Sequence, residues 1–356
     1  MDPVIDAVVT WVDGSDPVHA ARRRAALATE GRAAPRAGAE TRFADRGEIY
    51  WCLASLLRFA PFLRRIHLVT DAQRPEHLDA FARAGLCAPD RIRVVDHREV
   101  FAGHEAALPT FSSRSIEAAI GRVPGLADYA LYLNDDFFLA APAEPGQFVS
   151  PDGRVILHGR MRDARWPRLK ARLRRDLSRG RAADPGFGAA QARAAAEVGM
   201  GRYLSLGHHP HILRRDTMAA AFDESRLARQ IAHRFRHADQ LLPVALANQL
   251  ELRAGRAIVR PPADVAYVRP GRPDEARAAL DRLDAKTARF GCIQSLDEIA
   301  AADPSLARRI GVSLDRLLGE ALPPVIRSSQ APEGLAEASS DRVPGGNGTS
   351  TERHTG

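Results

Sequence analysis

The sequence predicts an α/β protein with a mostly parallel central sheet flanked by helices. Residues 4–12, 65–71 and 91–95 are rich in Val, Ile and other strand-forming residues. Helical patterns lie between them, and strands that alternate with helices usually pair in parallel. An apolar run at residues 129–133 lacks polar alternation, which is typical of a central strand covered on both faces.

The first predicted strand ends in two acidic residues, Asp13 and Asp16. Asp16 precedes Pro17 and is expected to cap the helix that starts there. A strand-to-helix junction also offers N–H groups to an anion and carboxylates to a ribose or base. A structural cap explains the same residues equally well.

The next elements follow the same rhythm. Apolar spacing predicts a helix over residues 47–60 that packs on the sheet, after a loop at residues 31–41. The strand at residues 65–71 ends at Asp71, and residues 75–84 are expected to be helical. Ser112 or Ser113 is expected to cap a further helix, and residues 154–158 are a candidate edge strand.

The central strand stops abruptly at Asn134, Asp135 and Asp136. Open α/β sheets bind ligands at the carboxyl ends of their strands. Two adjacent carboxylates held there would repel each other unless a positive charge lay between them. A hard divalent cation that also touches a substrate phosphate meets this need. A solvated turn is the alternative, because Asn and Asp favour turns.

Residues 160–181 predict a strongly basic helix without a long apolar stripe. Such a segment indicates either a solvated face or a surface that meets an anionic acceptor or lipid headgroups. From residue 274 to residue 322 the pattern is helical. After about residue 328 the composition predicts a disordered tail.

Two histidine-containing motifs follow the basic segment. His208 and His211 could bind a metal, but no partners at zinc-finger spacing follow, so a loop that contacts substrate is predicted. His233, Arg234 and Arg236 open a predicted helix. Arginines offer forked donors to a pyrophosphate, and a histidine can carry a proton. Exposed charges at a helix start are the alternative.

Composition narrows the class of protein. The net charge is +7, but the arginines are scattered without interleaved aromatic residues, which argues against a nucleic acid partner. Cys52, Cys87 and Cys292 are far apart and indicate reduced thiols. No signal peptide or membrane span is evident, so we expect a cytoplasmic protein, with association at the inner face of the membrane left open.

Taken together, these motifs resemble the Stealth family, which includes bacterial capsule-polysaccharide phosphotransferases and the catalytic subunit of N-acetylglucosamine-1-phosphotransferase. The resemblance covers about residues 4–325. Four blocks match in order: residues 5–17, 42–75, 108–139, and the pair of motifs at residues 208–211 and 233–236.

The resemblance implies a GT-A-like fold and transfer of a sugar 1-phosphate from a nucleotide sugar to a polysaccharide or glycan acceptor. It implies that Asp135 and Asp136 bind a divalent cation, Mg or Mn, with the diphosphate, and that His233 is catalytic. Arg114 stands where relatives often have His, and Gln240 where an acidic residue is expected. Positions around the nucleotide sugar are Asp13, Asp16, Arg42, Glu48 and Asp71.

Residue chemistry agrees with this function. A cation with Arg234 and Arg236 would neutralise the phosphate oxygens, and His233 could act as general base or as nucleophile. Two alternatives stay open: a metal-dependent glycosyltransferase that releases a nucleoside diphosphate, and a catalytically silent polyanion-binding protein.

We expect four parts in the chain. They are a nucleotide-sugar-binding core with the metal motif at residues 1–159, a basic helical insertion at 160–205, a helical C-terminal part at 206–327 that completes the active site, and a disordered tail at 328–356.

Overall fold

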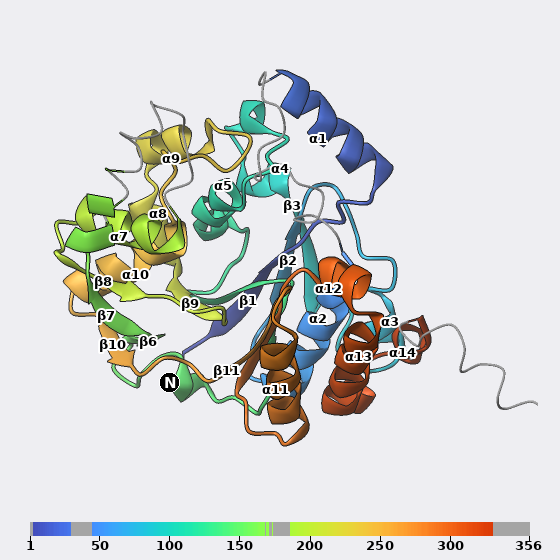
Figure 1. Ribbon diagram of the computed structural model, residues 1–356. Helices are drawn as coiled ribbons and strands as arrows, with labels where there is room; N and C mark the ends of the chain where they lie inside the picture. The colour runs from blue at the N-terminus through green and yellow to red at the C-terminus, as the bar shows by residue number, and fades with distance from the viewer. Residues whose placement is uncertain (1–2, 30–44, 168, 171–172, 174–185, 330–356) are drawn as a thin grey trace, which may run out of the picture.

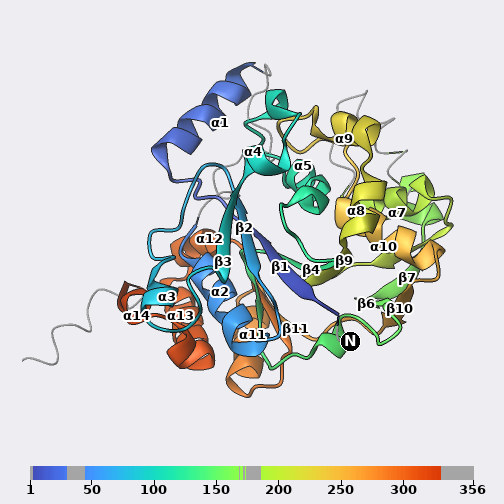
Figure 2. The ribbon, with the colours of Figure 1, turned by 180° about the vertical axis from the view of Figure 1, so that it is seen from behind.

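The computed structural model describes residues 3–29, 45–167, 169–170, 173 and 186–329 (Figure 1). Its main sheet has the strand order β3-β2-β1-β4-β9, which Figure 2 shows from behind. The first four strands are parallel and β9 is antiparallel to β4. The predicted mostly parallel α/β sheet is therefore confirmed. The strands are β1 (Ile5–Thr10), β2 (Ile66–Thr70), β3 (Ile92–Asp96), β4 (Tyr129–Asn134) and β9 (His211–Arg214).

A smaller sheet continues from the end of β4. Strand β5 (Phe137–Leu139) pairs antiparallel with β12 (Phe290–Ile293), which pairs with β11 (Val265–Val268). Gly291 is required there, because a Cβ atom at this position would lie 2.0 Å from Cζ of Phe138. The Phe138 ring therefore lies directly over the backbone of β12 at Gly291.

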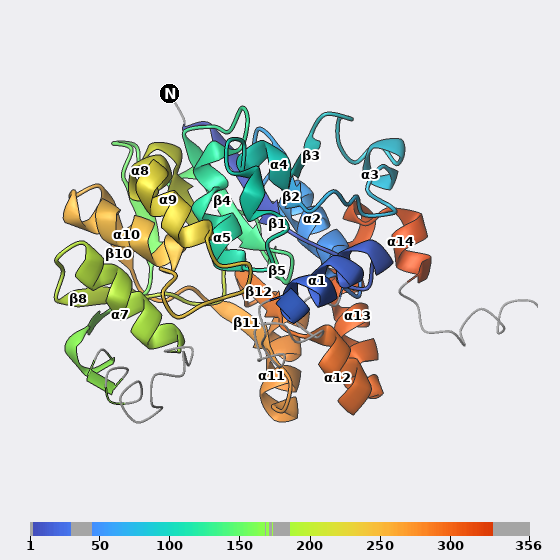
Figure 3. The same ribbon diagram turned by 90° about the horizontal axis from the view of Figure 1, so that it is seen from above.

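Helices enclose the sheets in two groups. Seen from the front and from above, α7–α10 and α11–α14 lie to either side of the main sheet (Figures 1 and 3). Helix α2 contacts β5 and α13, and its buried face includes Leu53 and Leu56. The helices are α1 (Pro17–Thr29), α2 (Glu48–Phe59), α3 (Ala80–Arg83), α4 (His97–Val100), α5 (Ser113–Ala118), α7 (Phe187–Glu197), α8 (Arg215–Ala221), α9 (Glu224–Ile231), α10 (Pro243–Arg253), α11 (Pro273–Asp284), α12 (Leu296–Ala302), α13 (Pro304–Leu318) and α14 (Pro324–Ser329). Within the described part of the chain, none of these helices has the length and apolar composition of a transmembrane segment.

Several local predictions need correction. Arg160–Asp163 form strand β7, paired with β8 (Arg202–Ser205), instead of opening a helix. The C-terminal part is helical in α11–α14, but it also supplies β9, β11, β12 and the strand β10 (Ala257–Arg260), which pairs with β6 (Val155–His158). The predicted helix over 75–84 is reduced to α3. Residues 328–329 belong to α14, and the remainder of the predicted tail lies outside the described residues.

A buried carboxylate links the amino-terminal ends of the main strands. Asp6 is 0% exposed and accepts two hydrogen bonds from the Arg64 guanidinium, at 3.0 and 2.7 Å. His67 and the backbone N–H of Ala127 lie at 3.0 and 2.9 Å. Burial alone would raise the pKa of Asp6, but these hydrogen bonds lower it well below its ordinary value.

We expect Asp6→Asn to lower the free energy of unfolding by about 3 kcal/mol at pH 7, because it removes the charge from a buried acceptor that Arg64, His67 and the N–H of Ala127 all contact. A carboxylate whose pKa is lowered by folding stabilises the protein above its unfolded pKa, and that contribution is lost as the pH falls. The difference from the unchanged protein should therefore narrow below about pH 4. Urea unfolding measures it. Asp90→Asn is the control, because Asp90 forms an exposed ion pair with Arg65 at 3.5 Å. This variant should change the free energy of unfolding little.

Candidate active site

A cavity of about 270 Å³ opens at the carboxyl ends of β1 and β4. Thr10, Trp11 and Val12 line it from β1, and Asn134 to Asp136 line it from β4. The strand order reverses between these two strands, since β2 and β3 lie on one side of β1 and β4 on the other. Such a switch point leaves a crevice in which α/β proteins bind their ligands.

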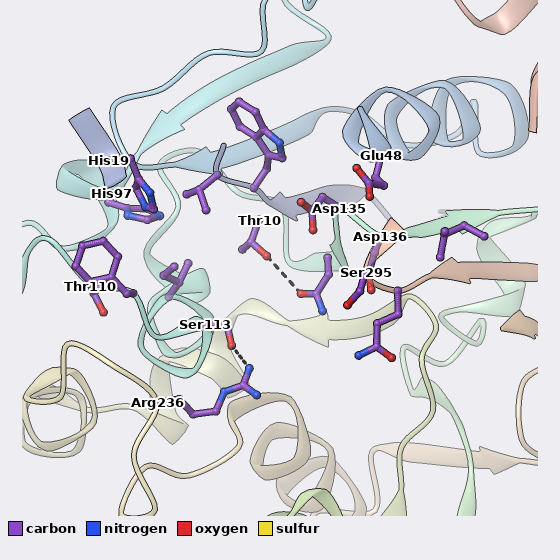
Figure 4. Close-up of a pocket in the computed structure, with 17 residues that line it drawn as sticks. Thr10, His19, Glu48, His97, Thr110, Ser113, Asp135, Asp136, Arg236 and Ser295 are labelled. Carbon is purple, nitrogen blue, oxygen red and sulfur yellow. Dashed lines mark hydrogen bonds between the residues drawn. The ribbon is translucent and has the colours of Figure 1, made fainter. Parts of the chain in front are cut away.

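Acidic side chains gather at one side of this cavity, where Figure 4 shows Glu48, Asp135 and Asp136 close together. Burial, and then the charge of Asp136, raises the pKa of Asp135 well above its ordinary value. Burial also raises the pKa of Asp136 to about 6. Burial and the neighbouring Asp45 raise the pKa of Glu48 to about 8. The protein thus concentrates carboxylates where their ionised forms are disfavoured.

These residues fit a divalent cation. The oxygen donors of Asp135 and Asp136 are of the type that Mg²⁺ and Mn²⁺ prefer. Oδ1 of Asp136 is buried and has no hydrogen-bond partner among the described residues, so an acceptor is left open. Backbone pairing fixes the position, because the N–H of Ile293 donates to the carbonyl of Asp136 at 3.0 Å.

The segment at residues 233–240 supplies a positively charged side chain, Arg236, opposite the acidic residues of the cavity. Nη2 of Arg236 donates to Oγ of Ser113 at 2.7 Å, and both residues line the cavity (Figure 4). Nε of Arg236 is buried and has no partner within the described part of the chain. The segment lies against the chain that leads into α5, since the N–H of Phe111 donates to the carbonyl of Arg234 at 2.6 Å. Arg236 therefore keeps a donor free for an anion.

Gln240, at the end of this segment, fixes the segment in place through the hydrogen bonds of its side-chain amide. Its Oε1 accepts from Ser112 at 2.8 Å and from the N–H of His237 at 3.0 Å. Its Nε2 donates to Ser115 and to the carbonyl of Gln230, both at 2.9 Å. A carboxylate could not donate these last two bonds, which gives a physical reason for an amide where the resemblance led us to expect an acid.

Asn134 presents one end of its amide to the cavity. The hydroxyls of Tyr132 and Thr10 donate to its Oδ1, at 2.8 and 3.5 Å. Thr10 and Asn134 are also paired across β1 and β4. Because the oxygen is engaged, the NH₂ group is the end left to donate toward a ligand.

A second hollow of about 330 Å³ adjoins the first and shares Trp11 and His19 with it. Asp13, Asp16 and Asp71 line it, as expected for one binding region. Two of them also serve the local fold. Asp16 caps α1 by accepting from the N–H of His19 at 2.7 Å, and Asp13 accepts from Ser15. Asp13 and Asp16 therefore support the local fold and also line the hollow.

Four predicted site residues lie outside both hollows. The ring of His208 stacks on Tyr267 at 4.6 Å, and the Tyr267 hydroxyl donates to Gln294, which lines the main cavity. His211 lines a separate, water-sized cavity. The Arg234 side chain donates to the carbonyl of Pro109 at 2.8 Å. The fourth is His233, and Arg42 lies outside the described residues.

The ligand atoms of His233, His237 and Asp239 lie within 4.8 Å of one another. However, the two imidazole rings are stacked, with centroids 4.0 Å apart and planes 11° apart. A metal ion binds imidazole in the ring plane, and two nearly parallel planes offer no shared position. This group is therefore a poorer cation site than the acidic pair.

Sequence reasoning missed several lining residues. His97 follows β3 directly and is 1% exposed, and burial lowers its pKa to about 4. Its place after a strand, like that of Asp71, could have indicated it. Gln294 and Ser295 follow β12, which the helical pattern of residues 274–322 concealed. Ser295 has φ 52°, a conformation that non-glycine residues adopt rarely and that recurs at functional sites.

Two family models match the chain. Residues 3–31 match Stealth protein conserved region 1, and residues 42–156 match conserved region 2. An exopolysaccharide phosphotransferase of Streptomyces coelicolor is 34% identical over 246 residues, which are 68% of this chain and 42% of that protein. The capsular polysaccharide phosphotransferase WcwK of Streptococcus pneumoniae is 36% identical over 149 residues, 42% of each chain. The chain spans about half or less of the length of the curated relatives it matches.

Solved structures of two glycosyltransferases are also similar. Mouse xyloside xylosyltransferase 1 aligns with a TM-score of 0.38 at 13% identity, over 82% of this chain and 98% of that one. The bifunctional glycosyltransferase WbbM aligns with a TM-score of 0.45 at 11% identity, over 93% of this chain and 52% of that one. On its two conserved regions and its sequence relatives, the chain belongs to the Stealth family.

Proposed function

We propose that the chain transfers a sugar 1-phosphate from a nucleotide sugar to a hydroxyl of a polysaccharide acceptor, in capsule or exopolysaccharide synthesis. One observation carries the proposal: carboxylates and an arginine with a free donor face one cavity at the switch point of the sheet. The names of the relatives, which are polysaccharide phosphotransferases, support it.

In this proposal Asp135 and Asp136 hold a divalent cation, which would supply positive charge to the diphosphate. Arg236 and the NH₂ group of Asn134 bind phosphate oxygens and stabilise the charge that develops on them. Asp13, Asp16 and Asp71 lie in the adjoining hollow and bind the nucleoside. Glu48 orients the neighbouring carboxylates of Asp135 and Asp136.

The reaction forms a bond between the acceptor oxygen and the sugar-linked phosphorus. It breaks the bond from that phosphorus to the bridging oxygen, and the nucleoside monophosphate leaves with the bonding electrons. The acceptor proton must be removed, and His233 is the proposed general base. Attack by His233 itself, through a phosphohistidine, stays open. We place the reaction in the cytoplasm, where nucleotide sugars would reach the site.

The product tests this function. The protein should be incubated with a panel of nucleotide sugars, a capsule-type glycan and Mg²⁺ or Mn²⁺, and the released nucleotide identified by chromatography. We expect a nucleoside monophosphate and a phosphodiester signal in the ³¹P spectrum. Release of a nucleoside diphosphate would instead show glycosyl transfer, and salt-sensitive glycan binding without turnover would show a binding protein.

Tyr132→Phe should lower kcat/KM for the nucleotide sugar by roughly tenfold or less, the effect of one hydrogen bond. The variant leaves Oδ1 of Asn134 with only the longer hydrogen bond from Thr10, at 3.5 Å, so the amide can turn more easily and its NH₂ group is held less firmly toward the cavity. Steady-state kinetics measures the change. Tyr129→Phe is the matched control, because Tyr129 lies at the other end of β4 and its hydroxyl donates to the carbonyl of Gly153. Equal losses in both variants would contradict the role given to Tyr132.

A further inference from the structure

The segment that begins with β7 and continues toward α7 carries the excess positive charge of the chain. Residues 160–181 contain ten Lys or Arg residues and two Asp residues, a net charge of +8, whereas the whole chain has +7. The remainder of the protein is therefore almost neutral. A charge concentrated in one segment indicates an anionic partner for that segment.

The described part of this segment also exposes apolar side chains. Residues 165–167, 169–170 and 173 are helical. Trp166, Leu169 and Leu173 are 72%, 48% and 53% exposed. Their spacing of three and seven residues places them on one helix face. The other two tryptophans, Trp11 and Trp51, are only 6% and 4% exposed, so the exposure of Trp166 is exceptional for its residue type.

The start of this helix is fixed to the folded protein. Ala164 is 1% exposed and packs in a cluster with Ala192, Ala195 and Tyr203. Strand β7 leads into the helix and pairs with β8, with Asp163 opposite Arg202. The Arg165 side chain donates to both carboxylate oxygens of Asp163. The apolar face is thus attached to an ordered base while its side chains face solvent.

We propose that the face formed by Trp166, Leu169 and Leu173, with the basic residues Arg165 and Lys170 beside it, docks on an anionic lipid bilayer. A helix with Trp and Leu on one face and Lys or Arg on the other lies in the interface of a membrane. A polyanionic glycan would use the charges and could stack a sugar ring on Trp166, but it leaves Leu169 and Leu173 without a role. Lipid explains both features.

Binding to vesicles tests the proposal with the full chain. The probes are vesicles of equal parts phosphatidylglycerol and phosphatidylcholine, compared with phosphatidylcholine alone. We expect sedimentation with the anionic vesicles and a blue shift of tryptophan emission on binding. Because Trp11 and Trp51 are buried, the shift reports Trp166, and Trp166→Phe should remove the shift while most of the binding remains.

The double variant Leu169→Asp with Leu173→Asp should weaken vesicle binding on the order of tenfold or more. Val312→Asp is the matched control, since Val312 is 54% exposed on α13, and it should bind as before. Salt-sensitive binding without a blue shift, unaffected by the double variant, would overturn lipid docking in favour of a polyanion. Absence of vesicle binding would also overturn it. Turnover of nucleotide sugar without vesicles is measured in parallel. Its outcome tests the proposed function independently of lipid docking.

Discussion

Asp136→Asn is expected to lower kcat by about 1,000-fold or more, because it removes charge from the proposed cation site while keeping the size of the side chain. The variant should also lose the dependence of nucleotide-sugar binding on added Mg²⁺ or Mn²⁺. Steady-state turnover and calorimetric titration, each with and without the metal, measure both effects. Asparagine is preferred to alanine because it leaves no cavity next to Cys292, whose Sγ lies 3.5 Å from Asp136.

Stability separates this loss from misfolding. A buried carboxylate without a cation is costly, and burial already raises the pKa of Asp136 to about 6. Without metal, Asp136→Asn should therefore unfold at the same temperature as the unchanged protein or higher. Asp128→Asn, at an exposed carboxylate paired with Arg215, is the control for the charge change alone. If Asp136→Asn kept full turnover and the same metal requirement, the cation assignment would be wrong.

The main sheet and the acidic pair could be predicted because their signals are local. Strands β1, β2 and β4 are almost wholly buried, so apolar composition marks them, and the change to polar residues after β4 marks the strand end. Parallel pairing then places the ends of β1 and β4 together, which is why Asp135 and Asp136 lie in a cavity.

Other elements depend on partners far away in the chain. Strand β12 has only four residues and forms because β5 and β11 lie on either side of it. Strand β7 alternates Arg with other residues and is fixed by its pairing with β8, which a reading of local composition cannot show. Gln294 and Ser295 were missed because they follow β12, and this strand could not be predicted from local composition.

The segment at residues 233–240 shows both cases together. Its chemistry was visible, because Arg236 does face the cavity. Its conformation was not, since α10 begins only at Pro243 and the segment is held by side chains of α5 and by Gln230 and Gln240. Such a polar network fixes one arrangement when every member is satisfied. His233, whose catalytic role stays a prediction, depends on the same network for its position, because its carbonyl accepts from Ser115 at 3.4 Å.

Arg236→Lys is expected to lower kcat by about 100-fold while the fold stays intact. The guanidinium uses Nη2 to bond Ser113 at 2.7 Å and keeps Nε without a partner among the described residues, so one planar group can hold α5 and donate to a phosphate oxygen at once. A lysine ammonium is a single point and cannot make this forked contact, although it keeps the charge. Kinetics with the nucleotide sugar measures the loss.

Arg234→Lys is the matched control, two residues away. Arg234 donates to the carbonyls of Pro109 and Ala106, at 2.8 and 3.3 Å, and does not line the cavity in the described structure. Its replacement should affect thermal stability more than kcat. If Arg236→Lys loses turnover and Arg234→Lys does not, the important property of Arg236 is its forked geometry and not its charge alone. Equal turnover in the two variants would show that charge near the cavity is sufficient and would remove the phosphate contact from the proposed mechanism.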